Sequence, residues 1–371
     1  MRDDTDMDRR RAVRTMLGVG ALPLVGACAQ ATASRPALTR RQLAGQRVIY
    51  SYPGLTVPPG LLRQISAGQA AGVIFFGENV TSEAQIVLVI RQLRQSQRRS
   101  PVASPLLLMT DQEGGLVRRL PGAPAPSEKQ VGAAAAPVAA ARSAGTGAGR
   151  NLAGVGMNVN LAPVLDVYHA PGDFTDQYQR SYSSSAATAA ACGKAFIAAQ
   201  QRAGVAATAK HFPGLGQAAA SQNTDTGPVT LHVSLPALRA RDEVPYPAAI
   251  AAGVKLVMAS WAIYPALDAT RPAGLSPAVI QGELRGRLGY RGVTITDAIE
   301  AGALGAFGGY GQRAVLAASA GMDLLLCSAR DPAQGQAVVT ALAGALDGGK
   351  LGAAGFGAAV QRVTALRNGL R

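Results

Sequence analysis

Short apolar segments recur along the chain from about residue 45 and alternate with longer stretches rich in Ala, Leu, Gln and Arg. The short segments are continuously apolar, which is typical of strands that are buried on both faces. The stretches between them, such as 186–202 and 312–320, are long enough to form helices. The predicted strands are Val48–Tyr52, Gly72–Phe76, Leu106–Thr110, Met157–Val167, Ala206–His211, Lys255–Trp261, Val293–Thr296 and Met322–Cys327.

This alternation predicts an α/β fold, a single-domain (β/α)8 TIM barrel over residues 45–371. A doubly wound sheet with helices on both faces is the structural alternative, because it has the same alternation. The length of 371 residues, with 48% hydrophobic residues, is sufficient for a large buried core without disulfides.

Polar residues follow four of the predicted strands. Asp111 comes after the third, Asp166 ends the fourth, Lys210 and His211 end the fifth, and Asp297 ends the seventh. In a (β/α)8 barrel the carboxyl ends of all strands meet at one face, where active sites lie. We therefore expect these side chains to converge on one mouth.

The first 28 residues have the pattern of an export signal. Four arginines at positions 9–14 precede a short apolar run, Met16–Ala27, which is too short to span a membrane. The run ends in Val-Gly-Ala-Cys, which resembles a bacterial lipobox and predicts lipidation of Cys28. We expect a signal peptide over 1–27, a tether over 28–44, and an exported lipoprotein on the outer side of the cell membrane. An ordinary secretory signal with an incidental cysteine is the alternative.

The charge balance is basic, with 36 Lys and Arg against 22 Asp and Glu and a formal net charge of +14. Aromatic residues make up only 5% and the basic residues are dispersed, so we expect no nucleic-acid partner. An anionic surface remains a possible partner, and general solubility is the simpler explanation of the charge. No metal or cofactor is expected.

Motifs in the predicted barrel together resemble glycoside hydrolase family 3, specifically its single-domain β-N-acetylglucosaminidase branch. In chain order they are Asp-Gln-Glu-Gly-Gly-Leu-Val-Arg-Arg at 111–119, Asn-Val-Asn-Leu-Ala-Pro-Val-Leu-Asp at 158–166, Arg-Ser-Tyr at 180–182, Lys-His-Phe-Pro-Gly at 210–214, and Thr-Asp-Ala-Ile at 296–299.

The resemblance implies the role of each matching residue. Asp297 occupies the position of the nucleophile in a retaining mechanism, which needs a carboxylate beside the anomeric carbon and a separate proton donor. A helix N-cap is the structural alternative for Asp297. The sugar-contacting positions of the family correspond to Asp111, Arg119, Arg180, Lys210 and His211.

The chain departs from the family pattern at the proton donor. Typical members continue the Lys-His-Phe-Pro-Gly motif with His-Gly-Asp and then Asp-Ser-His, whose Asp–His pair is the general acid/base. Here none of the three histidines, at 169, 211 and 232, occupies that position. If the loop is two residues longer, Asp225 falls there and is a candidate acid, since a carboxyl group with a raised pKa can donate directly. Asp225 is equally well explained as a turn residue, because Asn-Thr-Asp-Thr-Gly is common in turns.

The resemblance implies an exo-acting retaining β-N-acetylhexosaminidase that removes terminal non-reducing N-acetylglucosamine, with peptidoglycan fragments as the expected source. A family 3 β-glucosidase or glycosyl phosphorylase is one alternative. A non-catalytic lipoprotein that binds wall glycans is another, because the usual histidine is missing.

Overall fold

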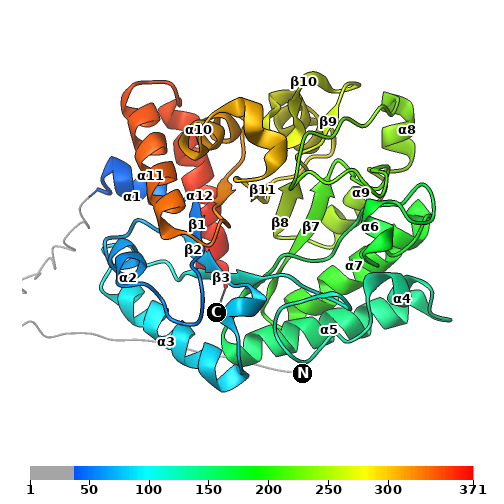
Figure 1. Cartoon of the computed structure of the whole chain (residues 1–371), viewed down its shortest axis with the longest axis horizontal. Helices are drawn as coiled ribbons and strands as arrows, with labels where there is room; N and C mark the ends of the chain where they lie inside the picture. The colour runs from blue at the N-terminus through cyan, green and yellow to red at the C-terminus, as the bar shows by residue number, and fades with distance from the viewer. Residues whose placement is uncertain (1–36, 371) are drawn as a thin grey trace, which may run out of the picture. The chain divides into compact units, whose positions relative to one another are not determined.

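The computed structural model describes residues 37–370, which form a closed barrel of eight parallel strands surrounded by helices (Figure 1). The prediction of a (β/α)8 barrel is confirmed, and the open doubly wound sheet is wrong because the first strand pairs with the last. Around the barrel the order is β1-β12-β11-β8-β7-β6-β3-β2. The bounds of the barrel strands are β1 Val48–Tyr50, β2 Gly72–Ile74, β3 Leu107–Thr110, β6 Val159–Asn160, β7 Ala206–Phe212, β8 Leu256–Ala259, β11 Val293–Ala298 and β12 Leu324–Leu326.

Helices connect successive strands and cover the outside of the barrel (Figure 1). The main ones are α2 Pro59–Ser66, α3 Glu83–Arg98, α5 Pro137–Val155, α7 Ala186–Arg202, α9 Pro245–Ala251, the π-helix η3 Ala278–Arg287, α10 Tyr310–Ala320, α11 Pro332–Asp347 and α12 Ala353–Gly369. Shorter elements are α1 Arg40–Gly45, η1 Gly77–Asn79, α4 Glu128–Gly132, α6 Phe174–Gln177, α8 Leu235–Ala240, η2 Ala273–Leu275, η4 Gly302–Phe307, and the hairpins β4 Gln112–Gly114 with β5 Val117–Arg118 and β9 Ile263–Tyr264 with β10 Asp268–Pro272. Across residues 37–370, no helix has both the length and the hydrophobicity needed to cross a bilayer.

The continuous apolar strands are explained by their two buried faces. In β1, Val48 and Tyr50 belong to the core that includes residues of the surrounding helices, whereas Ile49 belongs to the cluster inside the barrel. Leu324 and Leu326 of β12 likewise join the inner cluster. Since successive side chains point to opposite faces of a strand, a strand with two buried faces needs apolar residues at every position.

The end of the barrel where the strands begin, which we call the basal end, is closed by α12. Val363 and Leu366 of this helix join the inner cluster. Arg367 of the same helix is buried and donates hydrogen bonds to the carbonyl oxygens of Ser104 and Pro105, both at 2.7 Å. The opposite end, where the strands finish, is therefore the only end through which the barrel interior of the described chain opens, and we call it the mouth.

The strand predicted over Met157–Val167 is shorter than expected. Only Val159–Asn160 forms β6, and the following residues pair with β7 irregularly, through an isolated bridge between Val164 and Lys210 and a hydrogen bond from the Leu165 N–H to the Lys210 carbonyl at 2.6 Å. Pro163 has no N–H to donate, and the N–H of Val164 donates to the side chain of Glu128 at 3.0 Å instead of to a neighbouring strand. The hydrophobicity of this segment therefore reflects its burial, while its pairing beyond Asn160 is too irregular to extend the strand.

The folded domain also begins earlier than residue 45. Residues 40–45 form α1, which starts with a capping box at Thr39 and is tied to α11 by an ion pair between Arg40 and Asp347 at 3.1 Å. The last residues of the predicted tether are thus part of the domain. The predicted signal peptide, Cys28 and the first part of the tether lie outside the described residues.

Candidate active site

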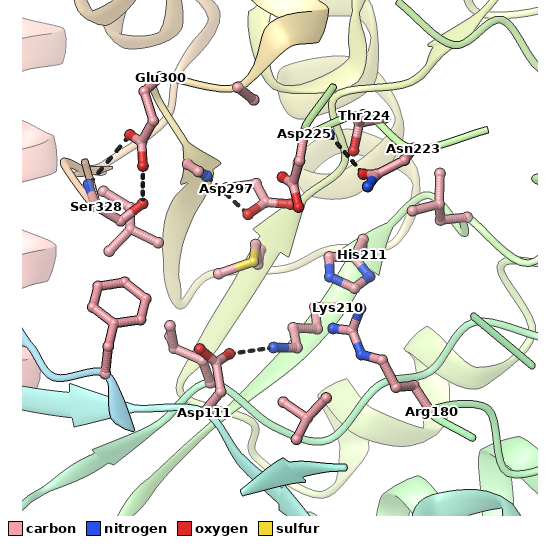
Figure 2. Close-up of a pocket in the computed structure, with 18 of the residues that line it drawn as sticks. Asp111, Arg180, Lys210, His211, Asn223, Thr224, Asp225, Asp297, Glu300 and Ser328 are labelled. Atoms are coloured by element: carbon pink, nitrogen blue, oxygen red, sulfur yellow. Dashed lines mark hydrogen bonds and ion pairs between the residues drawn. The ribbon is translucent and has the colours of Figure 1, made fainter. Parts of the chain in front are cut away.

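A pocket of about 390 Å³ opens at the mouth of the barrel (Figure 2). It is lined by residues that follow β3, β7, β11 and β12 and by the loop after β7. All seven barrel residues predicted as site residues line it, although they come from four separate motifs and from the loop that carries Asp225: Asp111, Arg119, Arg180, Lys210, His211, Asp225 and Asp297.

One wall of the pocket is a network of charged side chains around Lys210. Its ammonium group lies 2.7 Å from Asp111 and 2.8 Å from Glu113. Arg180 forms two parallel hydrogen bonds with the Glu113 carboxylate, from Nε at 2.8 Å and from Nη2 at 2.9 Å. Such bidentate pairs fix both position and orientation, so Glu113 holds the two cations that face the pocket.

Each charged group in this network stabilises the charged form of its neighbours. Burial alone raises the pKa of Glu113, but the positive charges of Arg180 and Lys210 outweigh it and lower that pKa to about 2. Burial also disfavours the charged form of Lys210, yet Asp111 and Glu113 raise its pKa above the ordinary value. At neutral pH the wall therefore presents fixed positive donors together with the Asp111 carboxylate.

His211 is oriented by a buried carboxylate. Its Nδ1 lies 2.7 Å from Asp166, which also accepts hydrogen bonds from the backbone N–H groups of His211 and Leu215. Burial raises the pKa of Asp166, but His211 and these hydrogen bonds outweigh it, so the pKa is lowered. An ionised Asp166 fixes the ring so that Nε2 is free for the pocket.

Asp225 lies on the long loop after β7, which is held against the segment after β11. The N–H of Gly302 donates to the carbonyl of Asp225 at 2.8 Å, and the N–H of Ala303 donates to that of Thr224 at 3.0 Å. A Cβ atom at Gly302 would lie 2.4 Å from the carbonyl oxygen of Thr226, so only glycine permits this approach. The backbone contact brings the loop beside the element that carries Asp297.

The structure contains features of both roles considered for Asp225, that of a turn residue and that of an acid in the pocket. Its backbone N–H donates to Asn223 Oδ1 at 2.9 Å, so it is part of a turn. Its side chain, however, lines the pocket, and its carboxylate takes no part in the turn's hydrogen bonds within the described residues. Partial burial and then the negative charge of Asp297 raise the pKa of Asp225 to about 6, against smaller opposing effects of His211 and Arg180.

Asp297 ends β11 and points into the pocket beside Asp225 (Figure 2). One of its carboxylate oxygens accepts a hydrogen bond from the N–H of Ala298 at 2.8 Å. The next helical element, η4, has Ala301 as its N-cap. Asp297 therefore caps no helix there, and its side chain is directed toward the cavity.

Sequence reasoning missed Glu113 and Glu300. Glu113 stands inside the Asp-Gln-Glu-Gly-Gly motif, which was the only signal that the sequence offered, and the structure buries it almost completely. Glu300, three residues after Asp297, also lines the pocket and accepts hydrogen bonds from Ser328 Oγ at 2.6 Å and Gln334 at 2.9 Å. Phe76 and Arg330 form the wall on this side, with the guanidinium 4.5 Å from the ring centre.

The other two histidines do not replace the missing one. His169 pairs with Asp242 at 2.8 Å and His232 is exposed, and neither lines the pocket. Among residues 37–370 no group of three or more His, Cys, Asp or Glu side chains has an arrangement suited to a metal ion. Besides Asp297, the carboxyl groups that line the pocket are Asp111, Asp225 and Glu300. Asp111 is paired with Lys210, and Glu300 accepts hydrogen bonds from Ser328 and Gln334. Among these three, within the described residues, only the Asp225 carboxyl has no such partner, which makes it the candidate proton donor.

Comparisons with known proteins agree with this geometry. Residues 61–366 match the "Glycosyl hydrolase family 3 N terminal domain". The chain is 47% identical over 329 residues, 88% of its length and 93% of the relative's, to an "Uncharacterized secreted glycosyl hydrolase" of Arthroderma benhamiae. It is 34% identical over 267 residues, 69% of its length and 75% of the relative's, to a "Beta-hexosaminidase" of Xanthomonas oryzae.

Two solved structures are similar over most of the chain. A family 3 β-N-acetylglucosaminidase from a Paenibacillus strain matches with a TM-score of 0.84 and 35% identity over 90% of this chain, which spans 63% of that protein's length. A β-N-acetylhexosaminidase from Beutenbergia cavernae matches with a TM-score of 0.81 and 32% identity over 89% of this chain and 99% of its own.

Proposed function

This chain belongs to glycosyl hydrolase family 3, and we propose that it is an exo-acting, retaining β-N-acetylhexosaminidase. The observation that carries the proposal is that six residues from four separate motifs line one pocket at the mouth of the barrel together with Asp225. Relatives named as β-hexosaminidases support the choice of substrate. We further propose terminal N-acetylglucosamine on peptidoglycan fragments as the natural substrate.

In the proposed first step, a carboxylate oxygen of Asp297 attacks the anomeric carbon while Asp225 donates its proton to the departing glycosidic oxygen. The bond to the leaving group breaks and a covalent glycosyl ester forms on Asp297. In the second step Asp225, now ionised, takes a proton from water, whose oxygen attacks the same carbon and releases Asp297. Asp111, Lys210, Arg180, Arg119 and His211 bind the sugar hydroxyls.

Two features support Asp225 as the acid. Its raised pKa of about 6 keeps a substantial protonated fraction in mildly acidic solution, whereas an ordinary aspartate is almost fully ionised there. Its loop is fastened by the Gly302 hydrogen bond to the segment that follows Asp297, so the two carboxyl groups are held at one site. A retaining hydrolase requires a proton donor and a carboxylate nucleophile at one site.

A chromogenic assay on the purified chain tests the activity. We expect release of nitrophenol from the β-N-acetylglucosaminide and much slower release from the β-glucoside. Faster turnover of the glucoside would make the enzyme a β-glucosidase. A sugar phosphate as the product when inorganic phosphate is present would make it a phosphorylase. Binding of wall glycan without turnover of either substrate would leave only a binding role.

The role of Asp225 is tested with leaving groups of different quality. General acid catalysis contributes roughly 10²–10⁴-fold, so Asp225→Asn should slow a natural disaccharide by that factor. A substrate with a very good leaving group needs little protonation, and its glycosylation step should be much less affected. Azide should partly restore turnover where release from Asp297 limits the rate.

Asn223→Ala is the matched control, because it removes the side-chain acceptor of the turn and keeps the Asp225 carboxyl. If the two variants show the same modest loss on all substrates, Asp225 acts only through the turn. A disaccharide rate unchanged by Asp225→Asn would also remove it from the mechanism.

We also propose that the protein is exported and anchored by a lipid on Cys28, which lies outside the described residues. The lipobox-like sequence before Cys28 supports this, and a relative is named as secreted. A fatty-acid probe should label the wild-type chain in cells and not Cys28→Ala. Both other cysteines, Cys192 and Cys327, are buried thiols, so equal labelling of the two chains would contradict the anchor.

A further inference from the structure

Exposed cations gather at the basal end of the barrel, away from the pocket. Arg63 lies in the last turn of α2, Arg98 and Arg99 end α3, and Arg202 ends α7. Lys255 directly precedes β8, and Arg291 precedes β11 by two residues. Because strands begin and helices end at this side of a (β/α)8 barrel, these six side chains share one face, which we call the basal cationic face.

Exposed carboxylates are segregated from this face. Of the five exposed acidic residues between positions 37 and 370, four lie at the mouth, where strands end and helices begin: Glu78, Glu83, Asp225 and Asp331. The fifth, Asp347, ends α11 at the basal end and is paired with Arg40. None of the six cations of the basal face has a carboxylate partner among the described residues.

Stabilisation of helix ends accounts for only part of this arrangement. A cation in the last turn of a helix interacts favourably with the helix dipole, which explains Arg63, Arg98 and Arg202. It does not explain Lys255 and Arg291, which stand in loops before strands. It also does not explain why exposed acidic residues are missing from the loops before β8 and β11.

The surface between the cations is partly apolar, and the half-buried Arg362 that lines it is paired with Asp323. The exposed positions of α12, which crosses this end, carry only Ala, Gly, Gln and Asn. Beside α12 a groove of about 500 Å³ is lined by apolar residues, including Val254, Leu366 and Leu370, with Lys255 and Arg291 at its sides. Uncharged exposed positions on α12, an apolar groove and surrounding cations complement a layer of anionic headgroups above acyl chains.

We propose that the basal cationic face docks the domain on the anionic headgroups of a lipid bilayer, so that the catalytic pocket faces away from the membrane. The folded domain begins at this same end, since α1 joins the end of α11 through Arg40 and Asp347. The proposal depends neither on catalysis nor on a lipid at Cys28. It concerns a reversible electrostatic contact made by the folded barrel itself.

Vesicle sedimentation tests the contact, with all variants made in the full chain carrying Cys28→Ser so that the N-terminal segment is constant and unlipidated. The basal triple variant is Arg99→Glu, Arg202→Glu and Lys255→Glu. The control triple variant is Arg91→Glu, Arg142→Glu and Lys194→Glu, which changes the net charge equally at exposed positions outside the basal face, also without carboxylate partners. Neither set touches the pocket, so turnover of the chromogenic substrate reports whether each variant is folded.

We expect the parent chain to bind phosphatidylcholine vesicles only when they contain phosphatidylglycerol. Each cation near an anionic surface increases binding about fivefold, so the basal triple variant should bind roughly 100-fold more weakly. The affinity of the control triple variant for the same vesicles should decrease much less. Raising the salt from ~0.1 M to ~1 M shortens the Debye length from about 10 Å to about 3 Å and should release the parent chain.

Equal losses in the two triple variants would show that only net charge matters and would overturn the proposal. Binding that does not depend on phosphatidylglycerol would do the same. If the chain binds a soluble polyanion through the basal cationic face but does not bind these vesicles, the partner of this face is an anionic polymer, and the membrane proposal is wrong.

Discussion

Replacing Glu113 with glutamine removes one negative charge from the buried network that holds Lys210 and Arg180. The side chain of Glu113 is almost fully buried, and it accepts three charged hydrogen bonds of 2.8–2.9 Å from the two cations. Glutamine has nearly the same shape but only one acceptor oxygen and no charge. The variant therefore leaves two buried cations with Asp111 as their remaining carboxylate partner in the network.

The expected loss of stability follows from the pKa of Glu113. Its displacement from 4.5 to about 2 corresponds to about 3 kcal/mol in favour of the ionised form in the folded protein. Removing one partner of a buried ion pair typically costs about 3–5 kcal/mol, which agrees with that figure. With about 2.1 cal/mol/K of unfolding entropy per residue over about 330 residues, 3 kcal/mol lowers Tm by about 4 °C.

Urea and thermal unfolding of Glu113→Gln and the wild type at several pH values check this prediction. The folded-state pKa of Glu113 is depressed, so its stabilisation is fully present above about pH 4.5 and is lost as the pH falls toward about 2. The difference between the two proteins should narrow over that range. Glu83→Gln, at an exposed position in the first turn of α3, is the control and should change stability by less than about 0.5 kcal/mol. A Glu113→Gln protein within about 1 kcal/mol of the wild type at pH 7 would refute the account of the network.

Three further outcomes are expected. Asp166→Asn should lower kcat/KM about 10–100-fold without unfolding the protein, because His211 loses a charged hydrogen-bond partner, and steady-state kinetics with circular dichroism measure both. The wild-type rate should fall as the pH rises above about 6, where Asp225 loses its proton, and Asp225→Asn should lack this fall in a pH–rate profile. Arg367→Met should destabilise the domain by about 2–3 kcal/mol in urea unfolding, since the carbonyls of Ser104 and Pro105 lose their charged donor.

The barrel was predictable because its strands are buried on both faces and so are continuously apolar. The same signal overestimated the strand at residues 161–167, where the apolar segment is buried but pairs with β7 only irregularly, because Pro163 lacks an N–H and that of Val164 donates to Glu128. Burial and extended pairing produce the same hydrophobic pattern, and local sequence does not separate them.

The site residues directly after strands were the easiest to place together, since barrel topology brings strand ends to one mouth. Asp225 stands 13 residues after the end of β7, and its position depends on the hydrogen bond from Gly302, a contact between segments far apart in the sequence. Glu113 was missed because its partners Arg180 and Lys210 come from two other segments, and only the folded chain brings the three together.

The central claim is that Asp297 is the nucleophile of a retaining glycosidase. Incubating the chain with a fluorinated N-acetylglucosaminide analogue that carries a good leaving group, followed by proteolysis and peptide mass spectrometry, tests it most directly. We expect one glycosyl adduct, on the peptide that contains Asp297, and none in Asp297→Ala, which should remain folded and lose nearly all turnover. An adduct on another residue, or an active Asp297→Ala enzyme, would contradict the account.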